Sequence, residues 1–235
     1  LLFLLIIEIS PKSKKIAYIA ALVCAFNPYN IHFSRGAWET NILTFELILA
    51  SYFFYKYTNH QQSKYLLFSA IIFGLSLFTY QAGKMISLFL IIILFILNFK
   101  SLQFKKLLFS FIIPLGIMTL PVAYGLFFNS NANRLQVVSL FSYPRSPAET
   151  ETIINETNRC DYQLFHSQPS FFIRNFLSWY FNHFSPRFLA FEGDWQNPRH
   201  SAPYIGVILY PSLIFLIIGL VFGFSRSQIA PINLF

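Results

Sequence analysis

Residues 34–41 read Ser34-Arg35-Gly36-Ala37-Trp38-Glu39-Thr40-Asn41, and they separate two long apolar runs. The run before them extends from Ile16 to Phe33, and the run after them extends from Ile42 to Tyr55. Continuous apolar runs with almost no polar residues are typical of transmembrane helices. The polar stretch between them is therefore predicted to lie at or just inside a membrane face.

Arg35 and Glu39 are the charged residues of this stretch. Ionisable groups at a membrane face are costly to desolvate, so we treat the pair as a functional-site hypothesis. Their four-residue spacing would place both side chains on one helical face if the segment were helical. The structural alternative is an interfacial arginine that reaches the lipid headgroups with Glu39 as its partner.

The composition extends the membrane prediction to the whole chain. Of the 235 residues, 55% are hydrophobic, 11% are charged and 30 are Phe, and the mean hydropathy is +0.54. We predict an all-α integral membrane protein with about six full spans and one partial span. The predicted runs are Leu1–Ile9, Ile16–Phe33, Ile42–Tyr55, Tyr65–Tyr80, Met85–Leu97, Leu107–Phe128 and Tyr204–Phe224. A span needs about 20 residues, so the shorter runs must include flanking polar residues.

This pattern divides the chain into three parts. Residues 1–128 are predicted to form transmembrane helices with short polar outer turns, and residues 129–203 a long extracytoplasmic loop. Residues 204–235 are predicted to form another transmembrane helix and the start of the next segment. Because the chain opens inside a run too short to span, we expect it to be part of a longer protein.

The distribution of basic residues predicts the orientation. If residues 11–15 are cytoplasmic and each run crosses once, nine basic residues fall on the cytoplasmic side and two, Arg35 and Lys84, in short outer turns. The cytoplasmic set is Lys12, Lys14, Lys15, Lys56, Lys64, Lys100, Lys105, Lys106 and Arg226. This asymmetry follows the positive-inside rule and places Arg35, Glu39 and the long loop outside the cytoplasm. We expect a multi-pass protein of the cell membrane.

The net charge of +8 is explained by this topology. Nucleic-acid binding would need a clustered basic face on a soluble module, and the sequence contains none, so no nucleic-acid partner is expected. Cys24 and Cys160 have no metal-ligand spacing. A metal site is not predicted, although a requirement for a divalent cation stays open.

The long loop becomes strongly aromatic between Leu164 and Trp195. Ser167 and Pro169 are suited to the start of a helix, and such a density of rings is typical of helices that lie in the membrane interface. Two interpretations follow. The helix forms a groove that admits a lipid-linked substrate from the bilayer, or it anchors the loop at the headgroup level.

The loop ends in a concentration of charge made by Glu192, Asp194, Arg199 and His200. Arginine binds phosphate oxygens bidentately, and carboxylates orient hydroxyls or act as a base, so this segment fits a phosphate-linked substrate. Glu46 is a further carboxylate deep within an apolar run, where it should face the interior of the bundle. We interpret Glu46 as a structural hydrogen-bonding group and keep a place in a site as the alternative.

Three blocks carry a family resemblance. They are Asn27 to Asn41 with Pro28 and Ser34-Arg35-Gly36-Ala37-Trp38-Glu39, then Gly74 to Lys84 with Tyr80-Gln81-Ala82-Gly83-Lys84, and finally Gly193-Asp194 with Arg199-His200. In order and spacing relative to the predicted spans, residues 1–224 resemble the bacterial polytopic glycosyltransferases of the C-type superfamily. These enzymes are relatives of the protein O-mannosyltransferases and of the lipid A aminoarabinose transferase.

The resemblance implies a reaction and roles for particular residues. A sugar carried on a polyprenyl phosphate would be transferred at the outer membrane face to a hydroxyl of a lipid, glycan or protein acceptor, without an organic cofactor. Glu39 matches the second acidic position of the family and would act as the catalytic carboxylate. The substrate-binding positions would be Arg35, Lys84, Tyr80, Asp194, Arg199 and His200. The family's main catalytic acid lies in a first outer loop, which we expect to be absent from these residues.

Two other functions stay open at this stage. A transporter or flippase of a lipid-linked or small substrate would need polar groups along a path through the midplane, and Glu46 is the feature that favours it. A non-catalytic scaffold of an envelope assembly is the other alternative.

Overall fold

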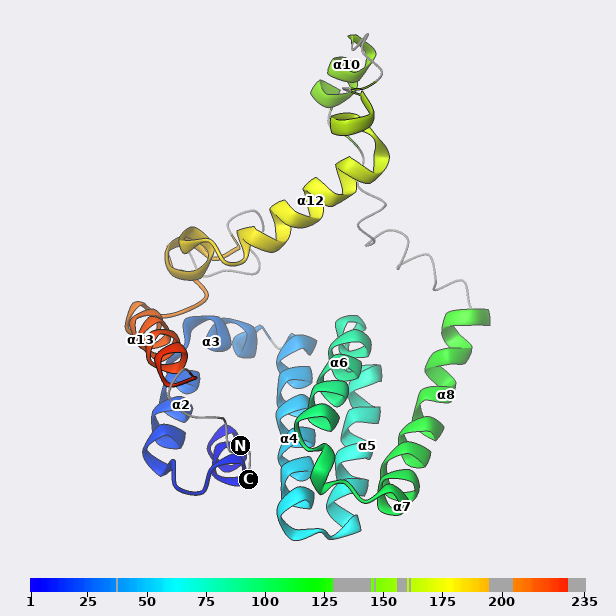
Figure 1. Ribbon diagram of the computed structural model, residues 1–235, viewed down its shortest axis with the longest axis vertical. Coiled ribbons are helices and arrows are strands. Elements are labelled where there is room, and N and C mark those ends of the chain that lie inside the picture. The colour runs from blue at the N-terminus through cyan, green and yellow to red at the C-terminus, as the bar shows by residue number, and fades with distance from the viewer. Residues whose placement is uncertain are drawn as a thin grey trace.

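A computed structural model of the chain describes residues 1–36, 38–128, 145, 147–155, 160, 162–194 and 205–227. The regular elements in this part of the chain are all helices, without a strand (Figure 1). The predicted all-α fold is therefore confirmed. The amino-terminal half contains the helices that form the site, and the carboxyl-terminal half contributes the loop helices and one further apolar helix.

The first three helices come from the beginning of the chain. They are α1 (Leu2–Ile9), α2 (Lys14–Phe26) and α3 (Pro28–Arg35). Helix α1 packs against α2 and against α4 (Glu39–His60), and α3 contacts both α2 and α4. Figure 1 shows α3 lying across the ends of α2 and α4, so it closes one end of this part of the molecule.

The predicted run Ile16–Phe33 is not one continuous helix, because the helix breaks at Asn27. Helices α2 and α3 meet there at an angle of 53°. Pro28 has no backbone N–H and disfavours helical geometry in the residue before it, and Asn27 accordingly has an extended backbone, with φ −65° and ψ 121°. The Asn27 side chain then accepts the backbone N–H of Tyr29 at 2.8 Å and caps α3.

The tightest packing lies among α4, α5 (Ser63–Thr79), α6 (Gln81–Leu97) and the helical segment that follows. Buried apolar residues from these elements form one core cluster: Ala50, Phe54, Tyr57, Leu66, Ala70, Phe73, Leu94 and Phe111. The α4–α5 turn needs a left-handed residue, Gln61 with φ 58°. Its carbonyl accepts a hydrogen bond from Lys106 Nζ at 2.7 Å, which connects the turn to the helical segment after α6.

The segment after α6 forms one long helical rod. It consists of α7 (Phe104–Leu107), the π-helical turn η2 (Leu108–Ile112) and α8 (Ile113–Phe128), after a short 3-10 turn η1 (Phe99–Ser101). Among the described residues, Phe104–Gly125 is the one continuous helix with both the length and the apolar composition to cross a membrane. The bent pair α2–α3 also qualifies when it is counted as one span, whereas α5, α6 and residues 210–221 are shorter apolar helices. The number of spans stays a prediction.

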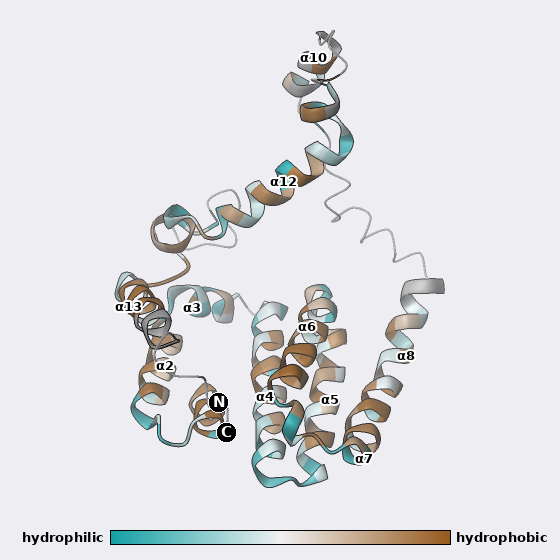
Figure 2. Cartoon of the chain, viewed as in Figure 1, coloured by the Kyte–Doolittle hydropathy of each residue, from teal (hydrophilic) through white to brown (hydrophobic). Residues whose placement is uncertain are grey.

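Large apolar side chains remain exposed along most of these helices. Figure 2 shows that strongly hydrophobic residues run along the helices. Examples are Phe26, Ile96, Phe109 and Phe215, each more than 60% exposed. In a membrane protein the lipid covers such surfaces. The exposure therefore agrees with the membrane character predicted from the composition.

Helices also form the described part of the loop. They are α10 (Pro147–Asn155), the π-helical turn η5 (Tyr162–His166), α12 (Gln168–Asn182) and the π-helical turn η6 (Arg187–Glu192). Ser167 occupies the N-cap position of α12 as predicted, although its hydroxyl pairs with the Ser170 hydroxyl at 2.9 Å instead of a backbone N–H. The last described helix, α13 (Tyr210–Ser227), begins six residues later than the predicted run.

Candidate functional site

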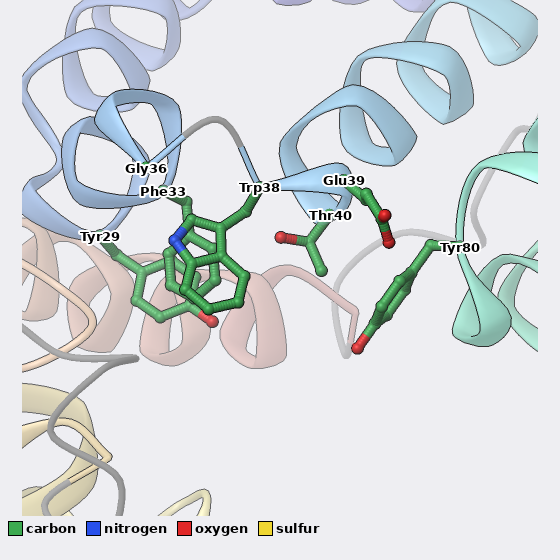
Figure 3. Close-up of a pocket in the computed structure, with 7 residues that line it drawn as sticks. All are labelled: Tyr29, Phe33, Gly36, Trp38, Glu39, Thr40 and Tyr80. Atoms are coloured by element: carbon green, nitrogen blue, oxygen red, sulfur yellow. The ribbon is translucent and has the colours of Figure 1, made fainter. Parts of the chain in front are cut away.

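A cavity of about 450 Å³ lies where the α3–α4 corner meets the α5–α6 junction. Its lining residues are Tyr29, Phe33, Gly36, Trp38, Glu39, Thr40 and Tyr80 (Figure 3). Small-molecule sites usually have volumes of about 300–1,000 Å³, so the cavity is large enough for a ligand. It combines aromatic walls with a few polar groups, as ligand sites commonly do.

Three rings form the α3 side of the cavity. Tyr29 and Phe33 lie one turn apart on α3, with ring centroids 4.3 Å apart, and the Trp38 ring follows at 5.9 Å from Phe33. Gly36 lets the Trp38 indole fold back over the end of α3. A Cβ atom at Gly36 would collide with Nε1 and Cδ1 of that indole.

Glu39 and Thr40 form the polar floor between the two aromatic sides. Glu39 is in the first turn of α4, where the helix dipole favours a negative charge. Figure 3 shows its carboxylate directed toward the Tyr80 side of the cavity. Thr40 lines the cavity, and its hydroxyl is buried without a hydrogen-bond partner among the residues that the structure describes.

Tyr80 forms the opposite wall and interrupts two helices. Its backbone is extended, with φ −152° and ψ 150°. Tyr80 is the C-cap residue of α5 and also the N-cap residue of α6. This break turns the ring toward the cavity instead of leaving it on a continuous helix surface (Figure 3). Tyr80 and Glu39, which are both predicted site residues, thus line one cavity although 41 positions separate them in the sequence.

Asp194 approaches the same region from the long loop. It follows Gly193, whose φ of 60° lies in the left-handed region where glycine is favoured. The Asp194 carboxylate and Tyr80 both act electrostatically on the Tyr29 hydroxyl. Asp194 is therefore near the α3 wall of the cavity. The loop thus contributes a carboxylate to the region formed by the amino-terminal helices.

The expectation that Arg35 and Glu39 share one helical face is wrong. Arg35 is the last residue of α3 and Glu39 is the first residue of α4, so the two side chains belong to different helices. The physical reason is local, since α3 ends at Arg35 with Gly36 as its C-cap, and Trp38 has an extended backbone, with φ −71° and ψ 136°. Arg35 is exposed next to the cavity and is not among its lining residues.

The three remaining predicted binding residues are Lys84, Arg199 and His200. Lys84 lies in the first turn of α6, and its ammonium donates to Gln81 Oε1 at 2.9 Å, outside the cavity lining. Arg199 and His200 lie outside the described residues. The assignment of catalytic and binding roles to all these residues stays a prediction.

Sequence reasoning missed Tyr29, Phe33, Trp38 and Thr40 as cavity residues. Tyr29 and Phe33 are four residues apart, the spacing of neighbours on one helical face. Once a helix is expected to begin after Asn27, this spacing predicts that the two rings lie side by side. No comparable local signal marks Trp38 or Thr40, because their positions depend on how α3 and α4 meet. Among the residues that the structure describes, no group of three His, Cys, Asp or Glu side chains could hold a metal ion.

Comparison with known proteins identifies the family. Residues 1–124 match the profile of the dolichyl-phosphate-mannose-protein mannosyltransferase family. The match covers more than half of the 235 residues, and the chain belongs to this family of glycosyltransferases. No curated protein and no solved structure matches the chain.

The match confirms the resemblance seen in the sequence. It includes Arg35, Glu39, Tyr80 and Lys84 and ends before the long loop, so Asp194, Arg199 and His200 fall outside it. The family is membrane-associated and transfers sugars from lipid-linked donors, which agrees with the helical and apolar character of the chain.

Proposed function

We propose that this chain belongs to a cell-membrane glycosyltransferase that uses a polyprenyl-phosphate sugar as donor. The acceptor is a hydroxyl of a lipid, glycan or protein at the extracytoplasmic face. The observation that carries the proposal is the cavity in which the Glu39 carboxylate lies between the aromatic wall of α3 and Tyr80.

Glu39 supplies the base in this reaction. Its carboxylate removes the proton from the acceptor hydroxyl while the hydroxyl oxygen attacks the anomeric carbon of the donor sugar. The bond between that carbon and the phosphate oxygen breaks, and the polyprenyl phosphate leaves with the bonding electrons. One new glycosidic bond forms, and the proton stays on Glu39 until solvent removes it.

Arg35 stabilises the departing phosphate. Its guanidinium is at the exposed end of α3 beside the cavity, and an arginine there can bind two phosphate oxygens as negative charge develops on them. In the proposal Lys84, Arg199 and His200 contribute further positive charge around the lipid phosphate. Asp194 and Tyr80 orient sugar hydroxyls, and the reaction needs no organic cofactor.

The aromatic wall holds the sugar. Flat rings such as Tyr29, Phe33 and Trp38 present an apolar surface to the C–H face of a pyranose, and the unpaired Thr40 hydroxyl can bond to one of its oxygens. The membrane supplies the donor along the exposed apolar surface of the helices. The proposed orientation, with the cavity and the long loop outside the cytoplasm, follows from the asymmetry of basic residues.

The experiment that tests this proposal uses the complete protein purified into sealed liposomes with a panel of polyprenyl-phosphate sugar donors, mannose among them, each labelled in the sugar. We expect the label to appear in an added acceptor and free polyprenyl phosphate to appear in equal amount. A peptide that contains Ser and Thr and a lipid that carries a free hydroxyl, offered in parallel, distinguish the acceptor classes. Failure of every acceptor and every donor sugar to show transfer would contradict the proposal.

The same liposomes test transport. Movement of the intact labelled donor across the bilayer, without release of polyprenyl phosphate, would favour the flippase alternative. That alternative rests on Glu46, whose carboxylate accepts a hydrogen bond from Thr79 Oγ1 at 2.7 Å.

A further inference from the structure

Glu46 is a carboxylate within the apolar part of α4, and its bonded partner is on another helix. The hydroxyl of Thr79 donates to Glu46 Oε2 at 2.7 Å. The same hydroxyl is 3.3 Å from the carbonyl of Leu75 in its own helix. The contact with Glu46 is the shorter of the two, so it is the stronger hydrogen bond and the one that fixes this side chain.

Thr79 is the last residue of α5, directly before Tyr80. Tyr80 has an extended backbone and connects α5 to α6 without any intervening loop. The orientation of its ring therefore depends on where α5 stops. A hydrogen bond from α4 to the final residue of α5 fixes that point.

Close packing around the junction supports the same geometry. Gly83 N–H donates to the Tyr80 carbonyl at 3.0 Å. A Cβ atom at Gly83 would collide with the Ser76 carbonyl and would lie 2.9 Å from Leu43 Cδ1. Helices α4, α5 and α6 thus converge on the junction, and Glu46 supplies the side-chain hydrogen bond from α4.

We propose that Glu46 is a positioning residue that holds Tyr80 in the wall of the candidate active site by binding the hydroxyl of Thr79. The expected effect on kcat/KM rests on the proposed glycosyltransferase function, whereas the positioning of Tyr80 does not. Glu46 does not line the cavity, so it acts through Tyr80 and takes no part in the chemistry. Its function is to keep the distance between Tyr80 and Glu39 fixed while sugars enter and leave.

The kinetic test uses the complete protein in membranes and measures kcat/KM for the sugar donor. Glu46→Ala and Thr79→Val should each lower kcat/KM by about tenfold, as expected for the loss of one positioning hydrogen bond. The double variant should be no slower than either single variant. Glu46→Gln should stay close to the wild-type value, because its amide oxygen still accepts from Thr79.

Ser69→Ala is the matched control. Ser69 also lies on α5 and also bonds to α4, since its hydroxyl donates to the Ala50 carbonyl at 2.9 Å in a fully buried position. It is far along the helix from the Tyr80 junction. The control should lower thermal stability at least as much as Thr79→Val while leaving kcat/KM unchanged.

Two kinetic results would overturn the positioning role. If Glu46→Gln is as slow as Glu46→Ala, the carboxylate has a chemical role of its own. If the losses from Glu46→Ala and Tyr80→Ala multiply in the double variant, Glu46 does not act through Tyr80. An equal loss of kcat/KM in Ser69→Ala would assign the effect to general destabilisation.

A second measurement does not depend on transferase activity. A nitroxide label is attached at Tyr80→Cys in a background that carries Cys24→Ser and Cys160→Ser, and its mobility is read by electron paramagnetic resonance. We expect Glu46→Ala to raise the mobility of the label and Glu46→Gln to leave it unchanged. If the label responds but no sugar is transferred, the proposed function fails while the positioning role stands. If Glu46→Ala leaves the label unchanged, the positioning role is refuted whatever the activity.

Discussion

Replacement of Gly36 by Ala gives a sharp test of how the cavity is formed. The backbone of Gly36 has φ −76° and ψ −1°, a negative-φ conformation that is open to alanine as well as glycine. The substitution therefore changes only the space around one added methyl group. That methyl group would collide with Nε1 and Cδ1 of Trp38 and would lie 3.4 Å from Cε2 of the same indole.

Two responses are available to the protein, and both affect the site. If the indole stays, an overpacked contact costs about 1–3 kcal/mol. If the indole rotates away, the cavity loses part of its aromatic wall. In either case we expect the free energy of donor binding to weaken by at least about 1 kcal/mol, the lower end of the packing cost. This loss corresponds to about a fivefold rise in the apparent dissociation constant.

The assay combines fluorescence with donor binding. The chain has three Trp, so Trp179→Phe and Trp195→Phe leave Trp38 as the single reporter. We expect Gly36→Ala to shift the Trp38 emission and to weaken donor binding at least fivefold. Gly116→Ala is the matched control, since nothing lies within 4 Å of the added methyl group, and it should leave both readings unchanged.

Wild-type emission and donor binding in Gly36→Ala would refute the packing of Trp38 on Gly36. A second refutation comes from the Trp38→Ala background. There the methyl group has nothing to collide with, so Gly36→Ala should add no further loss of donor binding.

Two further predictions concern the stability of the helices around the site. Asn27→Ala should lower the unfolding free energy by about 0.5–2 kcal/mol, because it removes the cap of the Tyr29 N–H at 2.8 Å; thermal unfolding in detergent measures this loss, and Asn27→Asp should restore most of it. Phe54→Ala should cost up to about 3–5 kcal/mol, since the ring is fully buried in the core cluster. Phe109→Ala, at a side chain that is 67% exposed, should change the unfolding midpoint little, and equal losses in the two Phe variants would contradict the assigned core.

The sequence predicted the helical class and the position of most helices because long apolar runs are a strong signal. The runs Ile42–Tyr55, Tyr65–Tyr80 and Met85–Leu97 fall on α4, α5 and α6. Ile16–Phe33 contains two helices, α2 and α3, because an uninterrupted apolar run does not reveal a break in the helix. The signal for that break was present in Asn27-Pro28, where a capping side chain precedes a residue that cannot donate a backbone hydrogen bond.

The candidate site could be predicted only in part. Charged residues at a membrane face drew attention to Glu39, and the resemblance drew attention to Tyr80. The contribution of Trp38 and Thr40 depends on the angle between α3 and α4, and the pairing of Glu46 with Thr79 joins positions 33 residues apart. Contacts of this kind arise from tertiary packing, which no local pattern encodes.

In the proposed sugar transfer, Glu39 removes the proton from the acceptor hydroxyl. The most direct measurement is the single-turnover rate of transfer from a polyprenyl-phosphate sugar by Glu39→Gln in the complete protein. Glu8→Gln is the control, because Glu8 is a carboxylate on α1 that bonds Asn59 at 2.9 Å, away from the cavity. We predict a rate at least about 100-fold below wild type for Glu39→Gln, with donor binding retained, and a wild-type rate for Glu8→Gln. A wild-type rate in Glu39→Gln would contradict the account.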